Sequence, residues 1–150
     1  MPSSWTPCRS PSTGAKRFSS TPAPRHRGWP YVSGTAAAER CLRATEVRNV
    51  FCGHTHVPAI FYALPDRTPI GFAPQDGFPA PLSTVRRHVV VVGAVGQPRD
   101  GNPAACFALL DEAARTVTTV RIPYDHETTA RKIGAAGLPP WLGMRLKIGR

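Results

Sequence analysis

The chain has 150 residues, which fits one domain, and 41% of them are hydrophobic, which is enough for a modest core. Its formal net charge of +10 favours anionic partners, but the basic residues form no dense run, so a nucleic acid is not expected as a partner. No apolar stretch approaches the roughly 20 residues of a membrane helix, and the 4 cysteines form no Cys-x-x-Cys pair, so we expect no membrane partner and a reduced, cytoplasmic setting.

The N-terminal stretch differs in composition from the rest of the chain. Residues 1–27 are basic, contain no acid and are rich in Ser and Pro, which predicts a disordered tail. An alternative hypothesis is that these residues are out-of-frame translation, which the neighbouring genomic DNA would reveal. Organised sequence begins near Trp29, and we expect residues 28–150 to form the folded domain.

The first part of this domain predicts a helix followed by two strands. Residues 35–44 are good helix formers, and Ser33 or Thr35 is expected as the N-cap. Residues 47–52 are typical of a buried strand, and residues 57–64 predict a second strand after a turn.

The middle of the chain predicts a loop, a buried strand and a hairpin. Residues 65–83 carry Pro and Gly at short intervals, as loops do. Residues 88–92 are apolar enough for a strand that is buried on both faces, and residues 93–103 are rich in turn formers. Residues 105–111 and 116–122 predict two strands of a hairpin.

Two helices are expected at the C-terminal end. Asp125 can cap a helix that runs through residues 128–136 and ends at Gly137. Pro139 and Pro140 can open a short terminal helix, because Pro is tolerated in the first turn. Strands, a hairpin and flanking helices together predict a mixed α/β layer structure.

One short motif carries candidate chemistry. Gly53-His54-Thr55-His56 directly follows a predicted strand, where histidines two residues apart can face one metal or two adjacent metals. A glycine before them would let the backbone approach a neighbouring ligand closely. Alone, such a pair is more often two ordinary surface histidines, so the motif needs its context.

The surrounding residues supply that context. The run Val-Phe-Cys-Gly-His-Thr-His-Val-Pro over residues 50–58 resembles the last metal-binding motif of the calcineurin-like metallophosphoesterases. Residues 93–111 resemble that family's Gly-Ser-Val-Gly-Gln-Pro-Arg-Asp loop and closing hairpin, with Ala94 in place of the Ser. Residues 122–139 resemble the C-terminal strand and helix of its bacterial members. The similarity covers about residues 29–150.

The resemblance implies a fold, a cofactor and a substrate class. The fold would be part of a two-sheet α/β sandwich, and the cofactor a binuclear centre of Mn, Fe, Zn or Ni. His54 and His56 would be metal ligands, and the substrate a phosphomonoester or phosphodiester. Arg99 is a candidate phosphate contact, because a guanidinium suits phosphate; a structural salt bridge or a solvated turn is the alternative.

The chain departs from the family pattern upstream of this motif. It contains no Asp-x-His, Gly-Asp or Gly-Asn-His, which supply the family's other ligands, and His26 is not assigned as one. We therefore expect metal binding to be weak or absent and the chain, read as truncated, to be inactive or weakly active. The alternatives are a non-catalytic remnant or partner-binding module and, third, a basic nucleic-acid-binding protein. Since the chain would hold about one sheet of the sandwich, a partner chain could cover the exposed sheet.

Three further residues have ordinary structural interpretations. Cys52 is expected to act as a small buried hydrophobe rather than a ligand. His88, at the start of the apolar strand, is expected to be structural. His126 is expected to be exposed to solvent at a helix N-terminus.

Overall fold

The structure is a computed structural model that describes residues 31–150. The predicted tail over residues 1–27 and His26 lie outside the described residues. The helices are α1 (Thr35–Arg43), α2 (His126–Ala135) and α3 (Pro140–Ile148). The strands are β1 (Asn49–Cys52), β2 (Ala59–Ala63), β3 (Ile70–Phe72), β4 (Pro79–Pro81), β5 (Arg87–Val91), β6 (Ala105–Asp111) and β7 (Thr116–Ile122).

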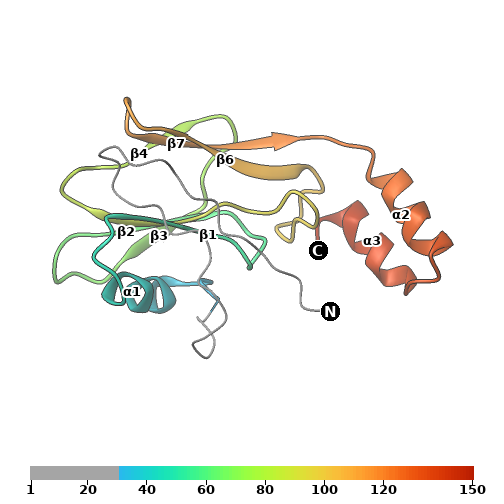
Figure 1. The fold of residues 1–150 in the computed structure, drawn as a ribbon, viewed down its shortest axis with the longest axis horizontal. Coiled ribbons are helices and arrows are strands. Elements are labelled where there is room, and N and C mark those ends of the chain that lie inside the picture. Colours follow the sequence, from blue (N-terminus) through green and yellow to red (C-terminus); the bar gives the residue numbers. More distant parts are fainter. Residues whose placement is uncertain (1–30) are drawn as a thin grey trace, which may run out of the picture.

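The strands form two sheets that lie one above the other (Figure 1). The four-stranded sheet has the order β1-β5-β2-β3, and the three-stranded sheet has the order β4-β7-β6. β1 and β5 pair in parallel, whereas the other strand pairs are antiparallel. The expectation that the chain holds about one sheet is therefore wrong, and the predicted mixed α/β class is confirmed.

The apolar core lies on both faces of the four-stranded sheet. Val89 and Val91 of β5 pack in one cluster with Leu42 of α1. Val90, which points to the opposite face, packs with Val117 of β7 in a second cluster. Because side chains alternate along a strand, the continuous apolar run of β5 serves both faces, and the result is three layers: α1, the first sheet and the second sheet.

The start of α1 differs from the prediction. The N-cap is Gly34, between the two expected candidates Ser33 and Thr35, and no side chain caps the helix. Gly34 has an extended backbone (φ −172°, ψ 176°), and its carbonyl accepts the first helical hydrogen bond from the Ala38 N–H at 3.0 Å. The cap is therefore made by the backbone alone; glycine is accepted at an N-cap, and no side chain supplies a capping hydrogen bond here.

The predicted loop over residues 65–83 contains two short strands. β3 and β4 have three residues each, too few for a periodic pattern. β4 is an edge strand with two prolines, which is where a sheet tolerates residues that lack an N–H. β3 pairs Gly71 with Phe61, and a Cβ on Gly71 would lie 2.5 Å from the Phe61 ring. The glycine that reads as a loop signal thus makes room for a core aromatic.

The C-terminal elements agree closely with the prediction. β6 and β7 have the predicted bounds, and α2 begins two residues early, at His126. The Asp125 carboxylate accepts the Thr128 backbone N–H at 2.9 Å, as an N-cap should. α2 and α3 form a helical pair beyond the ends of the sheets (Figure 1). Within residues 31–150 no helix has the length and apolarity needed to cross a membrane.

The three-stranded sheet has an apolar outer face. Leu109 and Ile122 are 56% and 50% exposed, on the face opposite to the one that packs against the first sheet. Figure 1 shows no helix of the described part of the chain over this face. The sheet face that the sequence predicts to be exposed is the inner one, which the second sheet covers; a partner chain stays a prediction.

Candidate metal site at the ends of β1 and β5

The Gly-His-Thr-His motif lies where two loops meet. β1 and β5 are parallel neighbours, so the loops that follow them leave the sheet at the same edge. The Arg99 N–H of the second loop donates to the His56 carbonyl of the first at 3.1 Å. The fold thus joins the two segments, 53–58 and 93–103, that the sequence singled out separately.

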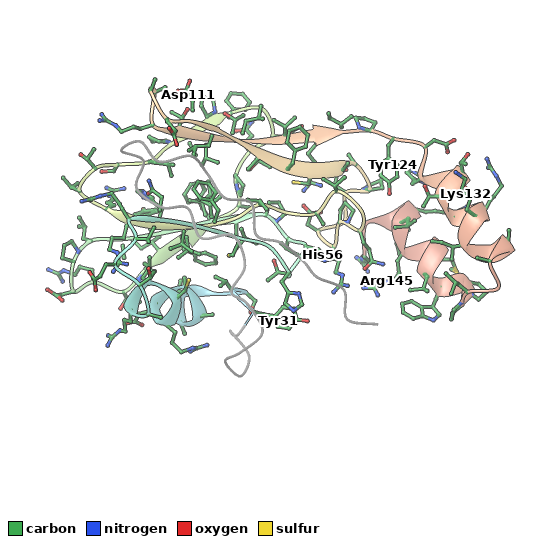
Figure 2. The ribbon with its side chains drawn as sticks, in the orientation of Figure 1. Tyr31, His56, Asp111, Tyr124, Lys132 and Arg145 are labelled. Atoms are coloured by element: carbon green, nitrogen blue, oxygen red, sulfur yellow. The ribbon has the colours of Figure 1, made fainter. Side chains whose placement is uncertain are left out.

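The imidazole of His56 has a defined orientation. Its Nδ1 lies 2.6 Å from the Gln97 carbonyl oxygen, and His56 is half-buried. Because a carbonyl oxygen can only accept, Nδ1 carries the proton and donates it. The Nε2 lone pair is then free, which is the arrangement that metal-binding histidines use. Figure 2 shows His56 at the end of the four-stranded sheet.

The imidazole of His54 is held by an aromatic neighbour. Its ring stacks on that of Tyr31, with centroids 4.1 Å apart and planes 25° from parallel. Tyr31 belongs to the segment that leads into α1, so the stack ties this segment to the histidine loop. His54 is itself exposed, and its ring edge remains accessible to a ligand.

Both histidines have an unusual backbone conformation. His54 has φ 79° and His56 has φ 62°, in the left-handed region that residues with a Cβ rarely adopt. Such conformations concentrate at functional sites, where the surrounding structure holds them in place. A Cβ at Gly53 would meet no described atom within 4 Å. The close approach of its backbone to a ligand stays a prediction, and the left-handed backbone belongs to the histidines.

The loop after β5 is packed tightly against β6. Gly93 has φ 80°, and a Cβ at this position would lie 2.5 Å from the Cys106 Sγ. The Arg99 side chain is exposed, and its Nη2 donates to the Gln97 Oε1 at 2.9 Å. Asp100 forms the ion pair of this loop, with Arg121. The arginine head group therefore lies at the surface, held by the Gln97 side-chain amide rather than by a carboxylate.

The neighbouring candidates are structural or inert. Burial and, secondarily, Cys41 raise the pKa of the Cys52 thiol to about 12, so the thiol is neutral at physiological pH, as expected of a small hydrophobe. His88 is 2% exposed, and its Nδ1 lies 2.9 Å from the Asn49 Oδ1, which confirms a structural role. His126 is half-buried, with its ring edge-on to Tyr124, so the expected exposure is wrong.

The described donors do not complete a metal centre. Among residues 31–150 no group of three or more His, Cys, Asp or Glu side chains is arranged to hold an ion. A catalytic site needs at least three protein ligands and, with two metals, carboxylates that neutralise the charge. His54 and His56 fit as two nitrogen donors of such a site, and the rest of the donor set is not found in this part of the chain.

Comparison with known proteins identifies the type of fold. The chain is 35% identical to a metallophosphoesterase from Sphaerobacter thermophilus, and the two structures match with a TM-score of 0.73 over 89% of this chain and 55% of that one. The chain has a metallophosphoesterase-like fold. An uncharacterized protein of Methanocaldococcus jannaschii is 33% identical over 101 residues, which are 67% of this chain and 39% of that protein. No family model matches the chain. The chain thus spans about half, or less, of the length of these relatives.

Two features of the site were missed by sequence reasoning. The Gln97 contact to His56 uses a backbone carbonyl, which no side-chain pattern reports. Tyr31 lies 23 positions before His54, and a single tyrosine ahead of a helix carries no signal of a stack. Only the fold brings these groups to the motif.

Proposed function

We propose that residues 28–150 are the C-terminal part of a calcineurin-like metallophosphoesterase domain, with His54 and His56 as metal ligands. The observation that carries this proposal is the combination of a metallophosphoesterase-like fold with a histidine pair in left-handed backbone just after β1, which pairs in parallel with β5. In such a site divalent ions activate water and polarise a phosphate ester. The proposed substrates are phosphomonoesters or phosphodiesters.

Each residue has a proposed role in that site. His56 offers Nε2 to the ion, because its Nδ1–H is engaged by the Gln97 carbonyl. His54 offers a ring whose plane is fixed by Tyr31. Arg99 is joined to His56 through its backbone N–H, and its exposed guanidinium is suited to contact phosphate oxygens.

A second function is favoured by that shortage of donors. Two imidazoles without a carboxylate hold a divalent ion weakly, so residues 31–150 on their own fit a non-catalytic metal-binding or partner-binding role. In this case the histidine pair would persist as a structural feature of the fold without turnover.

A hydrolysis assay separates the two functions. The chain is incubated with Mn²⁺ and bis(4-nitrophenyl) phosphate or 4-nitrophenyl phosphate, beside a His54→Gly/His56→Gly variant that removes both ligands without adding backbone strain. We expect at most a slow release of 4-nitrophenol. A rate above that of the double variant supports the phosphoesterase; equal rates remove the enzymatic function for this chain and support the non-catalytic role.

A further inference from the structure

A cavity of about 530 Å³ lies beside the histidine loop. Three segments form its walls: residues 31–33 before α1, Thr55 and Val57 of the histidine loop, and Ala59 and Phe61 of β2. Its volume falls within the usual range of small-molecule sites, which is about 300 to 1,000 Å³. Neither His54 nor His56 is among the described residues that line it, but Tyr31, which does line it, stacks on His54. A molecule that packs on Tyr31 would therefore have the Tyr31 ring between it and this proposed ligand.

The walls of this cavity are predominantly apolar. Val32, Val57, Ala59 and Phe61 contribute hydrocarbon surface, and among residues 31–150 none that lines it is charged. The Thr55 hydroxyl is turned back onto its own loop, where it accepts the Val57 N–H at 3.3 Å and lies 3.2 Å from the Val57 carbonyl. A charged or strongly hydrated group would lose its hydration here without new polar partners, which is unfavourable. Transfer of an apolar group from water to these walls is favourable.

One wall is a fixed aromatic ring. Tyr31 lines the cavity and is 54% exposed, while its ring is stacked on His54. The stack restricts the tyrosine rotamer, so little entropy remains to be lost when a ligand packs against the ring. Flat aromatic groups are the natural partners of such a surface, because ring stacking is favourable and tolerant of chemical identity.

We propose that this cavity is a subsite for a planar aromatic group, namely the alcohol portion of an aryl ester or the base of a nucleotide. The proposal rests on the proposed function for its orientation, since the phosphate of the same ester would lie at His54 and His56. The aromatic contact itself requires neither a metal nor turnover. Tyr31 is the residue that sets this preference for an aromatic substrate.

The test is binding to the full chain in the presence of EDTA, measured by saturation-transfer NMR. Phenyl phosphate and adenosine 5′-monophosphate are compared with glycerol 3-phosphate, which carries the same phosphate without a ring. We expect saturation of the ring protons for at least one aromatic ligand and none for glycerol 3-phosphate. Tighter binding of phenyl phosphate identifies an aryl ester, and tighter binding of adenosine 5′-monophosphate identifies a nucleotide.

Variants assign the binding to the cavity. Tyr31→Ala should weaken the aromatic ligand about tenfold, whereas Tyr31→Phe, which keeps the ring, should stay within about twofold of the unmodified chain. Phe78→Ala removes an aromatic ring that is 60% exposed but does not line the cavity, and it should have no effect. An unchanged amide NMR spectrum outside the 31–33 and 53–61 segments shows that Tyr31→Ala is folded.

The proposal is overturned if glycerol 3-phosphate binds as well as the aromatic ligands, if neither aromatic ligand binds, or if Tyr31→Ala binds them unchanged. Failure of the proposed function gives a different result. Aromatic binding that depends on Tyr31 in a chain that neither hydrolyses phosphate esters nor binds metal would retain the subsite and remove the phosphoesterase. Hydrolysis of phosphate esters without aromatic binding would retain the phosphoesterase and remove the subsite.

Discussion

His54 and His56 differ from ordinary surface histidines in their backbone. Both have positive φ angles, a conformation that costs a residue with a Cβ about 1 to 2 kcal/mol. Each ring has a partner that fixes its direction, Tyr31 for His54 and the Gln97 carbonyl for His56. At the residue scale the site is therefore a pair of oriented imidazoles in a strained loop.

The strain can be measured by comparing two substitutions at one position. Both His54→Gly and His54→Ala remove the ring and its stack, but only glycine adopts φ 79° without steric cost. We expect the glycine variant to have the larger free energy of unfolding, by about 1 kcal/mol, in urea titrations followed by circular dichroism. Equal stabilities would mean that residue 54 does not hold the left-handed conformation.

His88 makes the stability of the fold depend on pH. Burial, followed by the charges of Arg86 and Arg48, lowers its pKa from 6.5 to about 4. As the pH falls, the unfolded chain therefore takes up a proton at this residue at a higher pH than the folded chain does. The contribution of neutral His88 to the free energy of unfolding is fully present above about pH 6.5. It is lost as the pH falls toward 4, and the loss is on the order of 3 kcal/mol.

Urea titrations at pH 7 and pH 4.5 check this dependence. His88→Gln, which retains a hydrogen-bonding group toward Asn49 but cannot titrate, should lose less stability between the two pH values than the unmodified chain. The carboxylates titrate equally in both proteins, so the difference reports on His88. The same pH dependence in both would contradict the assignment.

At the scale of elements, the site depends on how the loop after β5 packs against β6 and the C-terminal helices. Gly93 lets the backbone turn away from the strand at φ 80° while it lies against Cys106 of β6. From there the loop reaches Gln97 and Arg99, which contact His56. At the far end Gly101 donates to the Gly149 carbonyl after α3, so the loop is held by both the sheet and the helical pair.

The role of Gly93 has a matched control in the same loop. Gly93→Ala combines a left-handed φ with a Cβ 2.5 Å from a sulfur atom, and we expect a loss of about 2 kcal/mol or more. Gly96→Ala meets no described atom within 4 Å and should change stability by less than about 0.5 kcal/mol. Thermal unfolding of the two variants is the measurement; a similar loss in both would argue against the packing of Gly93 on Cys106.

The sequence predicts some of these elements better than others, for physical reasons. The apolar run at Val89–Val91 predicts a doubly buried strand because nothing but burial on both faces explains it, and that prediction is confirmed. Gly71 reads as a loop signal because its reason, the Phe61 ring on the paired strand, is ten residues away. The histidine motif can be recognised in the sequence itself. The contacts of its two rings with the Gln97 carbonyl and with Tyr31 form only when the parallel strands and α1 are assembled.

At the scale of the whole molecule, the chain is three layers with a helical pair at one end (Figure 1). The histidine loop lies at the carboxyl ends of β1 and β5, the edge where α/β sheets commonly bind ligands. The cavity beside it opens between α1's leading segment and β2. The fold thus brings the oriented histidine pair and the apolar cavity together through Tyr31, which stacks on His54 and lines the cavity.

We propose that His54 and His56 together bind a divalent metal ion. Paramagnetic Mn²⁺ tests it directly, because it broadens the imidazole Hε1 NMR signals of the histidines that bind it, and the signals can be assigned with the His54→Gly and His56→Gly variants. We predict that the signals of His54 and His56 broaden at Mn²⁺ concentrations that leave those of His88 and His126 sharp. Equal broadening of all four signals, or sharp signals for His54 and His56 throughout the titration, would contradict the claim.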